Sequence, residues 1–268
     1  AISRLSKPGS VSKMIGLHNA LGSLGATIGL FSLSILVGNI GWRFVYLLWS
    51  IPTLVWCVAI LSYEEDRVVK SAKRTNVMDL KSVLNFKFAL LLSMIAFRDF
   101  GASAITTFIT TYMVNVRGLS QEVASMVFGL GPLIGVLSSI MGGYLSSRFG
   151  DAKTLFWMMV CSVFSLILLI TTEGLGLLLH TYLLYSFFNN SVWSPIGSLV
   201  AALTQSSKRG AGYSIYFFVE GTVTTIQPLI TAVAINYTSF YVIFPIGIGF
   251  TSICAVLLGC FYQYFKSP

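Results

Sequence analysis

The chain has 268 residues, of which 55% are hydrophobic and only 10% are Asp, Glu, Lys or Arg. Soluble domains carry about 25% charged residues, so these charges are too few to cover a water-facing surface, and a soluble enzyme is excluded. The formal net charge of +8 does not indicate a nucleic-acid partner, because the excess Lys and Arg lie in short loops between apolar segments. We therefore expect an integral membrane protein whose surroundings are the lipid bilayer.

Apolar segments long enough to span a bilayer recur along the whole chain. A span needs about 20 residues in a helix, and an open sheet would leave backbone groups unpaired in lipid. The sequence therefore predicts an all-α helical bundle of about eight transmembrane helices. The predicted spans are residues 12–37, 40–62, 88–115, 121–147, 154–173, 177–204, 211–235 and 239–265.

The basic residues agree with this number of spans and predict an orientation. Of the 17 Lys and Arg residues, Arg43 and Arg117 fall in loops on one side, and Arg98 falls within a span. All the others fall on the opposite side, together with both termini. Because cytoplasmic loops carry the excess of Lys and Arg, we expect a multi-pass protein of the cell membrane with both termini in the cytoplasm.

The sequence offers little support for catalysis, metal binding or a cofactor. The four cysteines lie within apolar runs, and His18 and His180 are far apart in sequence. The motifs H-E-x-x-H, G-x-S-x-G and G-x-x-x-x-G-K-[ST] do not occur in the sequence, which argues against an intramembrane enzyme and against an ATP-driven pump. We expect neither a cofactor nor a metal.

A hydrophilic stretch and a weak internal repeat predict how the spans are organised. Residues 9–29 and 41–44 have counterparts in 208–212 and 239–241, offset by about 200 residues, a spacing that suits parallel six-helix halves of a transporter. We therefore predict that residues 1–63 are the last two helices of an N-terminal half. Residues 64–87 would form a cytoplasmic central loop, and residues 88–268 a C-terminal six-helix half.

Short motifs in a consistent order carry a family resemblance. They are Gly41-Trp42-Arg43, Gly118-Leu119-Ser120, the loop from Gly143 to Lys153, and Gln227-Pro228. With the topology, they resemble the major facilitator superfamily of secondary transporters. The resemblance implies helices five to twelve of a twelve-helix fold, with the first four helices missing.

The loop from Gly143 to Lys153 resembles the cytoplasmic gating motif of that family. Gly143, Arg148 and Gly150 match the motif, whereas Ser147 stands where the family has Asp and Asp151 where it has a basic residue. The resemblance implies a charge network that stabilises one state of the gate. We therefore take the three matching residues as the candidate gating loop.

Charged residues within the predicted spans are the main candidates for solute binding or proton coupling. They are Arg98, Asp99 and Glu220; each such charge costs about 2.5–3.5 kcal/mol on insertion scales. Arg98 and Asp99 are neighbours, and their side chains leave a helix about 100° apart. We therefore expect no ideal ion pair, with one facing a cavity and the other an adjacent helix. The alternative is mutual neutralisation with a structural role.

Glu220 belongs to a polar stripe on one face of its predicted helix. The stripe comprises Tyr213, Tyr216, Glu220, Thr224 and Gln227, which should face water or a solute path rather than lipid. Burial away from water favours a neutral carboxyl group, so Glu220 is a candidate proton carrier. The alternative is a permanently protonated Glu220 bonded to a neighbouring carbonyl.

Two adjacent amides form a second polar region, in the predicted span 177–204. Asn189 and Asn190 could orient a solute by donating and accepting hydrogen bonds. Hydrogen bonding between helices is the favoured reading of both. We count them, with the stripe, as candidate cavity-lining residues.

These observations predict a proton-coupled secondary transporter that moves a small-molecule solute by alternating access. One alternative is a transport-incompetent fragment, which would need a separately encoded N-terminal segment. A less favoured alternative is an intramembrane enzyme. The identity of the solute stays open, because Glu220 and Asp99 suit a cation whereas Arg98 suits an anion.

Overall fold

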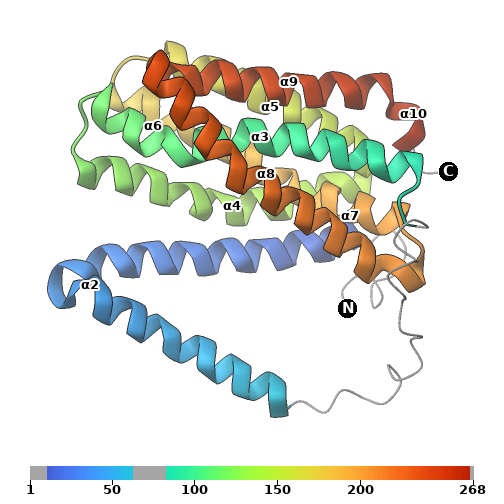
Figure 1. Cartoon of the computed structure of the whole chain (residues 1–268), viewed down its shortest axis with the longest axis horizontal. Helices are drawn as coiled ribbons and strands as arrows, with labels where there is room; N and C mark the ends of the chain where they lie inside the picture. Colours follow the sequence, from blue (N-terminus) through green and yellow to red (C-terminus); the bar gives the residue numbers. More distant parts are fainter. Residues whose placement is uncertain (1–10, 63–82, 266–268) are drawn as a thin grey trace.

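The computed structural model of the chain, which describes residues 11–62 and 83–265, is helical throughout its main elements (Figure 1). The first ten residues and most of the predicted central loop lie outside these described residues. The helices are α2 (Val11–Ser62), α3 (Phe86–Asn115), α4 (Gln121–Phe149), α5 (Asp151–Thr171), α6 (Leu175–Ser191), α7 (Trp193–Leu203), α8 (Arg209–Tyr237), α9 (Ile243–Cys260) and α10 (Tyr262–Phe265). The single turns η3 (Ser206–Lys208) and η4 (Phe240–Val242) precede α8 and α9.

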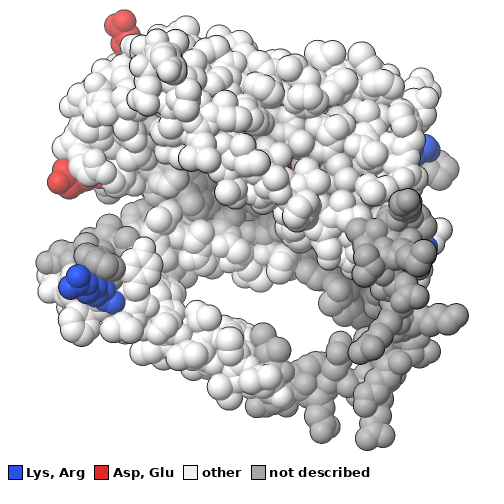
Figure 2. Space-filling model, viewed as in Figure 1, with Lys and Arg blue, Asp and Glu red and all other residues white. Residues whose placement is uncertain are grey.

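The predicted all-α membrane fold is confirmed. Within the described ranges, six helices are long and apolar enough to cross a bilayer, and Arg43–Ala59 forms a shorter apolar helix. In Figure 2 the charged side chains lie near the ends of the molecule, while the sides of the visible face are almost free of charge. That distribution suits a protein whose sides contact lipid.

The first two predicted spans form one element, α2, with a sharp bend. Gly41 has φ 76° and ψ 154°, which is not helical, and the second arm turns back there (Figure 1). A positive φ is accessible to Gly at little cost, which explains why the reversal occurs at this residue. The bend therefore lies within the predicted second span and not in the gap at residues 38–39.

Helices α3 to α9 pack together as the main bundle. Helix α3 packs on α8 and α9, α5 packs on α6 and α9, and α4 packs on α6. Two clusters of buried apolar side chains fill the bundle, one around Phe88, Leu155 and Leu258 and the other around Tyr112, Leu169 and Phe244.

The predicted span 177–204 is interrupted, because α6 ends at Ser191 and α7 begins at Trp193. Pro195 lies near the start of α7. Proline lacks an N–H donor and its ring clashes with the carbonyl group four residues earlier, so helical bonding back to Ser191 is lost. The interruption leaves backbone carbonyl groups near the middle of the span free for other partners.

The first arm of α2 packs closely against α4, most closely near its start. A Cβ atom on Gly16 would lie 2.6 Å from the Ser139 carbonyl oxygen, and one on Gly143 would lie 2.6 Å from that of Ser12. Farther along α2, Gly25 and Gly29 have nothing within 4 Å of such an atom. Gly25 lies about 180° around the helix from Gly16 and therefore points away from α4. A Cβ atom on Gly135 would lie 3.0 Å from Ser23 Oγ, so the close packing of α2 on α4 extends at least from Ser12 to Ser23.

Candidate functional site

A buried ion pair forms the centre of the candidate site. Arg98 Nη1 lies 2.6 Å from Asp99 Oδ1, and the two side chains are only 3% and 2% exposed. The expectation that these neighbours cannot pair was wrong, because the long Arg98 side chain curls back to its neighbour despite their different directions from the helix. The pair neutralises itself within α3, which is the alternative raised from the sequence.

Arg98 also connects α3 to the interruption between α6 and α7. Its Nη2 donates to the backbone oxygen and to Oδ1 of Asn189, each at 2.8 Å. Its guanidinium lies 4.6 Å from the centre of the Trp193 ring, a cation–π arrangement. One side chain thus contacts the end of α6 and the start of α7.

Glu220 on α8 faces this pair with one oxygen unsatisfied. Electrostatic interactions couple Glu220 to Asp99 and Arg98, and the Tyr216 side chain interacts with its carboxyl group. Glu220 Oε2 and Asp99 Oδ2 are buried and have no hydrogen-bond partner among the described residues. The three predicted charges therefore belong to one cluster, in which Asp99 pairs with Arg98 and Glu220 lies within electrostatic range of both.

The rest of the predicted α8 stripe is divided between buried and exposed positions. Tyr216 and Gln227 are buried, Tyr213 is half-buried, and Thr224 is exposed and donates to the Glu220 carbonyl. The Tyr213 hydroxyl donates to the Gly197 carbonyl at 2.6 Å, which ties α8 to α7. Hydrogen bonding between helices is thus what the structure shows for Tyr213.

A polar cavity lies between the first arm of α2 and the bundle, where Figure 2 shows the surface hollowed. Its volume is about 340 Å³. The lining comprises His18, Asn19, Leu21, Gly22, Ser23, Ser139, Asn190 and Trp193. Asn190 is the predicted polar residue found here; Asn189, next to it, binds Arg98 instead.

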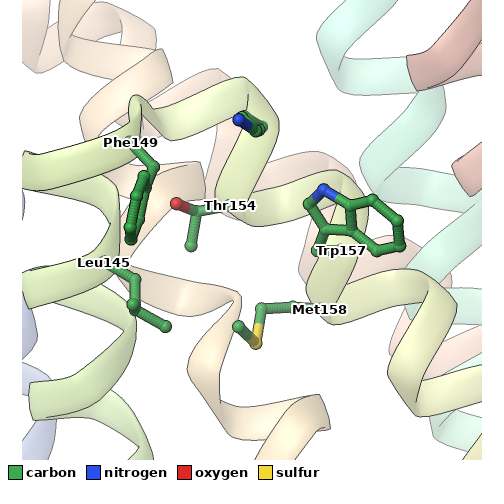
Figure 3. Close-up of a pocket in the computed structure, with 6 residues that line it drawn as sticks. Leu145, Phe149, Thr154, Trp157 and Met158 are labelled. Carbon is green, nitrogen blue, oxygen red and sulfur yellow. The ribbon is translucent and has the colours of Figure 1, made fainter.

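A second, apolar pocket lies where α4 meets α5 (Figure 3). It measures about 260 Å³ and is lined by Leu145, Phe149, Lys153, Thr154, Trp157 and Met158. Phe149 and Trp157 are about half exposed, so the pocket opens on the outside of the helices. We assign it no part in solute movement.

The candidate gating loop adjoins the close approach of α2 and α4. Gly143 makes that approach, and Gly150 separates α4 from α5 with φ 91°. Arg148 is exposed, and its Nη1 donates to the Tyr144 hydroxyl at 3.3 Å. The charge network implied for Arg148 is therefore replaced by a contact within α4.

Asp151, treated from the sequence only as a departure from the motif, makes the contacts between helices here. Ser12 Oγ donates to Asp151 Oδ1 at 2.8 Å and also lies 3.0 Å from Ser198 Oγ. Ser146 donates to the same carboxylate oxygen. Asp151 thereby holds α2, α4 and α5 together; the available signal was an Asp three residues before the predicted span 154–173, in the first turn of the observed α5.

Comparisons with known proteins agree with this architecture. A model of the Major Facilitator Superfamily matches residues 1–178 and 136–267, whereas no curated protein sequence matches significantly. Similar solved structures include a variant of the E. coli fucose:proton symporter FucP, with 14% identity and a TM-score of 0.70 over 100% of this chain and 72% of that one. A bacterial homologue of the iron transporter ferroportin in an outward-facing state has 16% identity and a TM-score of 0.69 over 97% and 66%.

A mutant of the peptide transporter POT in complex with sulfate is also similar, with 18% identity and a TM-score of 0.60 over 66% of this chain. The chain spans only 38% of that transporter's length. At these identities the structural likeness establishes the fold, while the family match extends over almost the whole sequence. The chain therefore belongs to the Major Facilitator Superfamily, a family of transporters and not of enzymes.

Proposed function

We propose that the protein is a proton-coupled secondary transporter, in which α2 and the α3–α9 bundle alternately open the polar cavity between them. The observation that carries this proposal is the cluster formed by the buried Arg98 and Asp99 with the half-buried Glu220. If all three groups were ionised, one negative charge would be uncompensated away from water, which is strongly unfavourable. A single proton on Glu220 removes that charge.

The cluster offers a physical connection between the proton and the solute path. Loss of the proton from Glu220 makes its carboxylate a second competitor for Arg98. Arg98 in turn holds Asn189 and stacks on Trp193, and Trp193 lines the cavity. A change in the Glu220 charge therefore acts on the α6–α7 junction, which borders the cavity.

The domain arrangement is part of the proposal. We place residues 1–63 in an N-terminal half, 64–87 in a cytoplasmic central loop and 88–268 in a C-terminal half, within the cell membrane and with cytoplasmic termini. The second arm of α2 carries exposed apolar side chains, and Phe44, Trp56 and Leu61 are 65%, 69% and 86% exposed. We propose that an N-terminal segment packs against this arm.

Replacing Glu220 by Gln in the complete transporter tests the coupling. Gln keeps the size of the side chain but cannot exchange a proton, so labelled solute should still exchange across proteoliposomes without a gradient. Accumulation driven by a pH gradient should disappear. Glu173→Gln is the matched control, because that side chain is exposed outside the cluster. Gradient-driven accumulation by the Glu220→Gln protein at the unaltered rate would contradict the proposal.

A further inference from the structure

The cavity between α2 and the bundle has a lining that is polar but carries no carboxylate, Lys or Arg side chain among the described residues. Asn19 and Ser23 come from α2, and Asn190 comes from the end of α6. Each of these side chains can both donate and accept hydrogen bonds. A solute hydroxyl group has the same dual capacity, so such a lining matches a molecule that presents several hydroxyl groups.

The Arg98 guanidinium, which lies against the lining residue Trp193, is not available to a solute in the cavity. Arg98 is 3% exposed, and its Nη1 and Nη2 are engaged by Asp99 and Asn189. Apart from the His18 imidazole, the described lining residues therefore offer no charged partner to a solute carboxylate or phosphate that leaves water. That exchange is unfavourable for an anion.

Trp193 disfavours a cationic solute for a related reason. Its ring is the aromatic surface of the cavity, and the Arg98 guanidinium already lies 4.6 Å from the ring centre. A second cation on the same ring would be repelled by the first, which reduces the usual cation–π attraction. The C–H surface of a neutral ring or chain meets no such repulsion.

We propose that this cavity binds a neutral solute with several hydroxyl groups, of the class of sugars and polyols. The inference rests on the proposed transport function, since it names the class of solute that the transporter moves. The volume of about 340 Å³ is near the lower end of small-molecule sites. A single six-carbon unit is therefore a better fit than an oligomer.

The test compares solutes of equal size and different charge on the purified full chain in lipid nanodiscs. The panel contains neutral hexoses and hexitols, gluconate as the anion and glucosamine as the cation, and equilibrium dialysis measures each Kd. We expect a neutral member to bind at least about tenfold more tightly than either charged one, which corresponds to about 1.4 kcal/mol. Tighter binding of gluconate or glucosamine, or no binding by any neutral member, would overturn the inference.

Substitutions on the α2 side locate the binding without disturbing the bundle. Asn19→Leu and Ser23→Ala, the latter adding no atom at the contact between Ser23 and Gly135, should each weaken binding of the neutral solute about 3- to 10-fold, the loss of one or two neutral hydrogen bonds. Asn236→Leu, at an exposed position near the end of α8, should leave Kd unchanged. Unchanged binding in both α2 variants would refute the site.

The two proposals can fail separately. A neutral solute that binds at this cavity but never crosses proteoliposomes would leave the inference intact and remove the transport function. Proton-driven uptake of a charged solute, with no binding of neutral solutes, would support the transport function and overturn the inference about the solute class.

Discussion

The contact between Gly16 and α4 allows the proposed movement to be tested by a single added methyl group. In Gly16→Ala the new Cβ would lie 2.6 Å from the Ser139 carbonyl oxygen and 3.2 Å from Gly143 Cα, where ordinary contact begins at 3.4 Å. The backbones must therefore separate by about 0.8 Å, and overpacking of this kind costs about 1–3 kcal/mol. If this end of α2 closes in one state and opens in another, only the closed state is penalised.

The expected size of the effect follows from that steric term alone. The gain in helix propensity from Gly to Ala, about 1 kcal/mol, applies to both states and cancels. The equilibrium should shift toward the open state by a factor of about 5 to about 150. Gly25→Ala, on the same helix with nothing within 4 Å, is the matched control and should shift nothing.

The assay measures how fast a cysteine at the closed end reacts with a thiol reagent. Ser198→Cys is suitable because Ser198 is 7% exposed and bonds to Ser12; the native cysteines are replaced first. Gly16→Ala should accelerate the reaction by the same factor, and Gly25→Ala should not. Equal rates in the two variants, with both proteins folded, would refute the argument that this contact opens.

Other substitutions test the contacts of the cluster and of the gate, again as expected outcomes. Asp99→Asn should lower the free energy of unfolding by about 3–5 kcal/mol, because it leaves Arg98 buried without its counter-ion. The double variant Arg98→Met/Asp99→Leu should lower this free energy by less, as measured by thermal unfolding. A larger decrease in the double variant would contradict the ion pair. Asp151→Ala should accelerate labelling of Ser198→Cys by about 10- to 150-fold through loss of a charge-assisted bond of about 1.5–3 kcal/mol, and Asp151→Asn, which keeps an acceptor oxygen, by less. Ser12→Ala should resemble Asp151→Ala, and slower labelling in either variant would exclude a latch.

Much of the fold could be predicted from the sequence because lipid restricts what a chain can do. Long apolar runs in lipid must be helices, and the distribution of Lys and Arg predicts on which side of the membrane each connecting loop lies. The bend at Gly41 and the interruption at Val192 were harder to place. Polar residues lie near both, Asn39 and Arg43 beside the first and Asn189 to Ser191 before the second. They do not fix the position, which depends on the conformational freedom of Gly and the missing N–H of Pro195.

The candidate site was predicted in composition but not in geometry. Hydropathy identified Arg98, Asp99 and Glu220, since charges stand out in apolar spans. Their mutual arrangement depends on how α3 packs against α8, and helix packing is not encoded in the periodicity of either helix. The same limit explains why Trp193 and Asp151, whose partners Arg98 and Ser12 lie far away in the sequence, were not singled out.

The central claim, that α2 moves against the α3–α9 bundle, is tested most directly by two distances measured in one protein. Spin labels at Lys13 and Ser147 report the end of α2 that contacts α4 most closely, and labels at Ile28 and Met126 report positions farther from that end on both helices. In the full chain in lipid nanodiscs, a change of pH should lengthen the first distance and shorten the second in the same molecules. Glu220→Gln should abolish this response. Two distances that stay fixed, or that change in the same direction, would contradict alternating access.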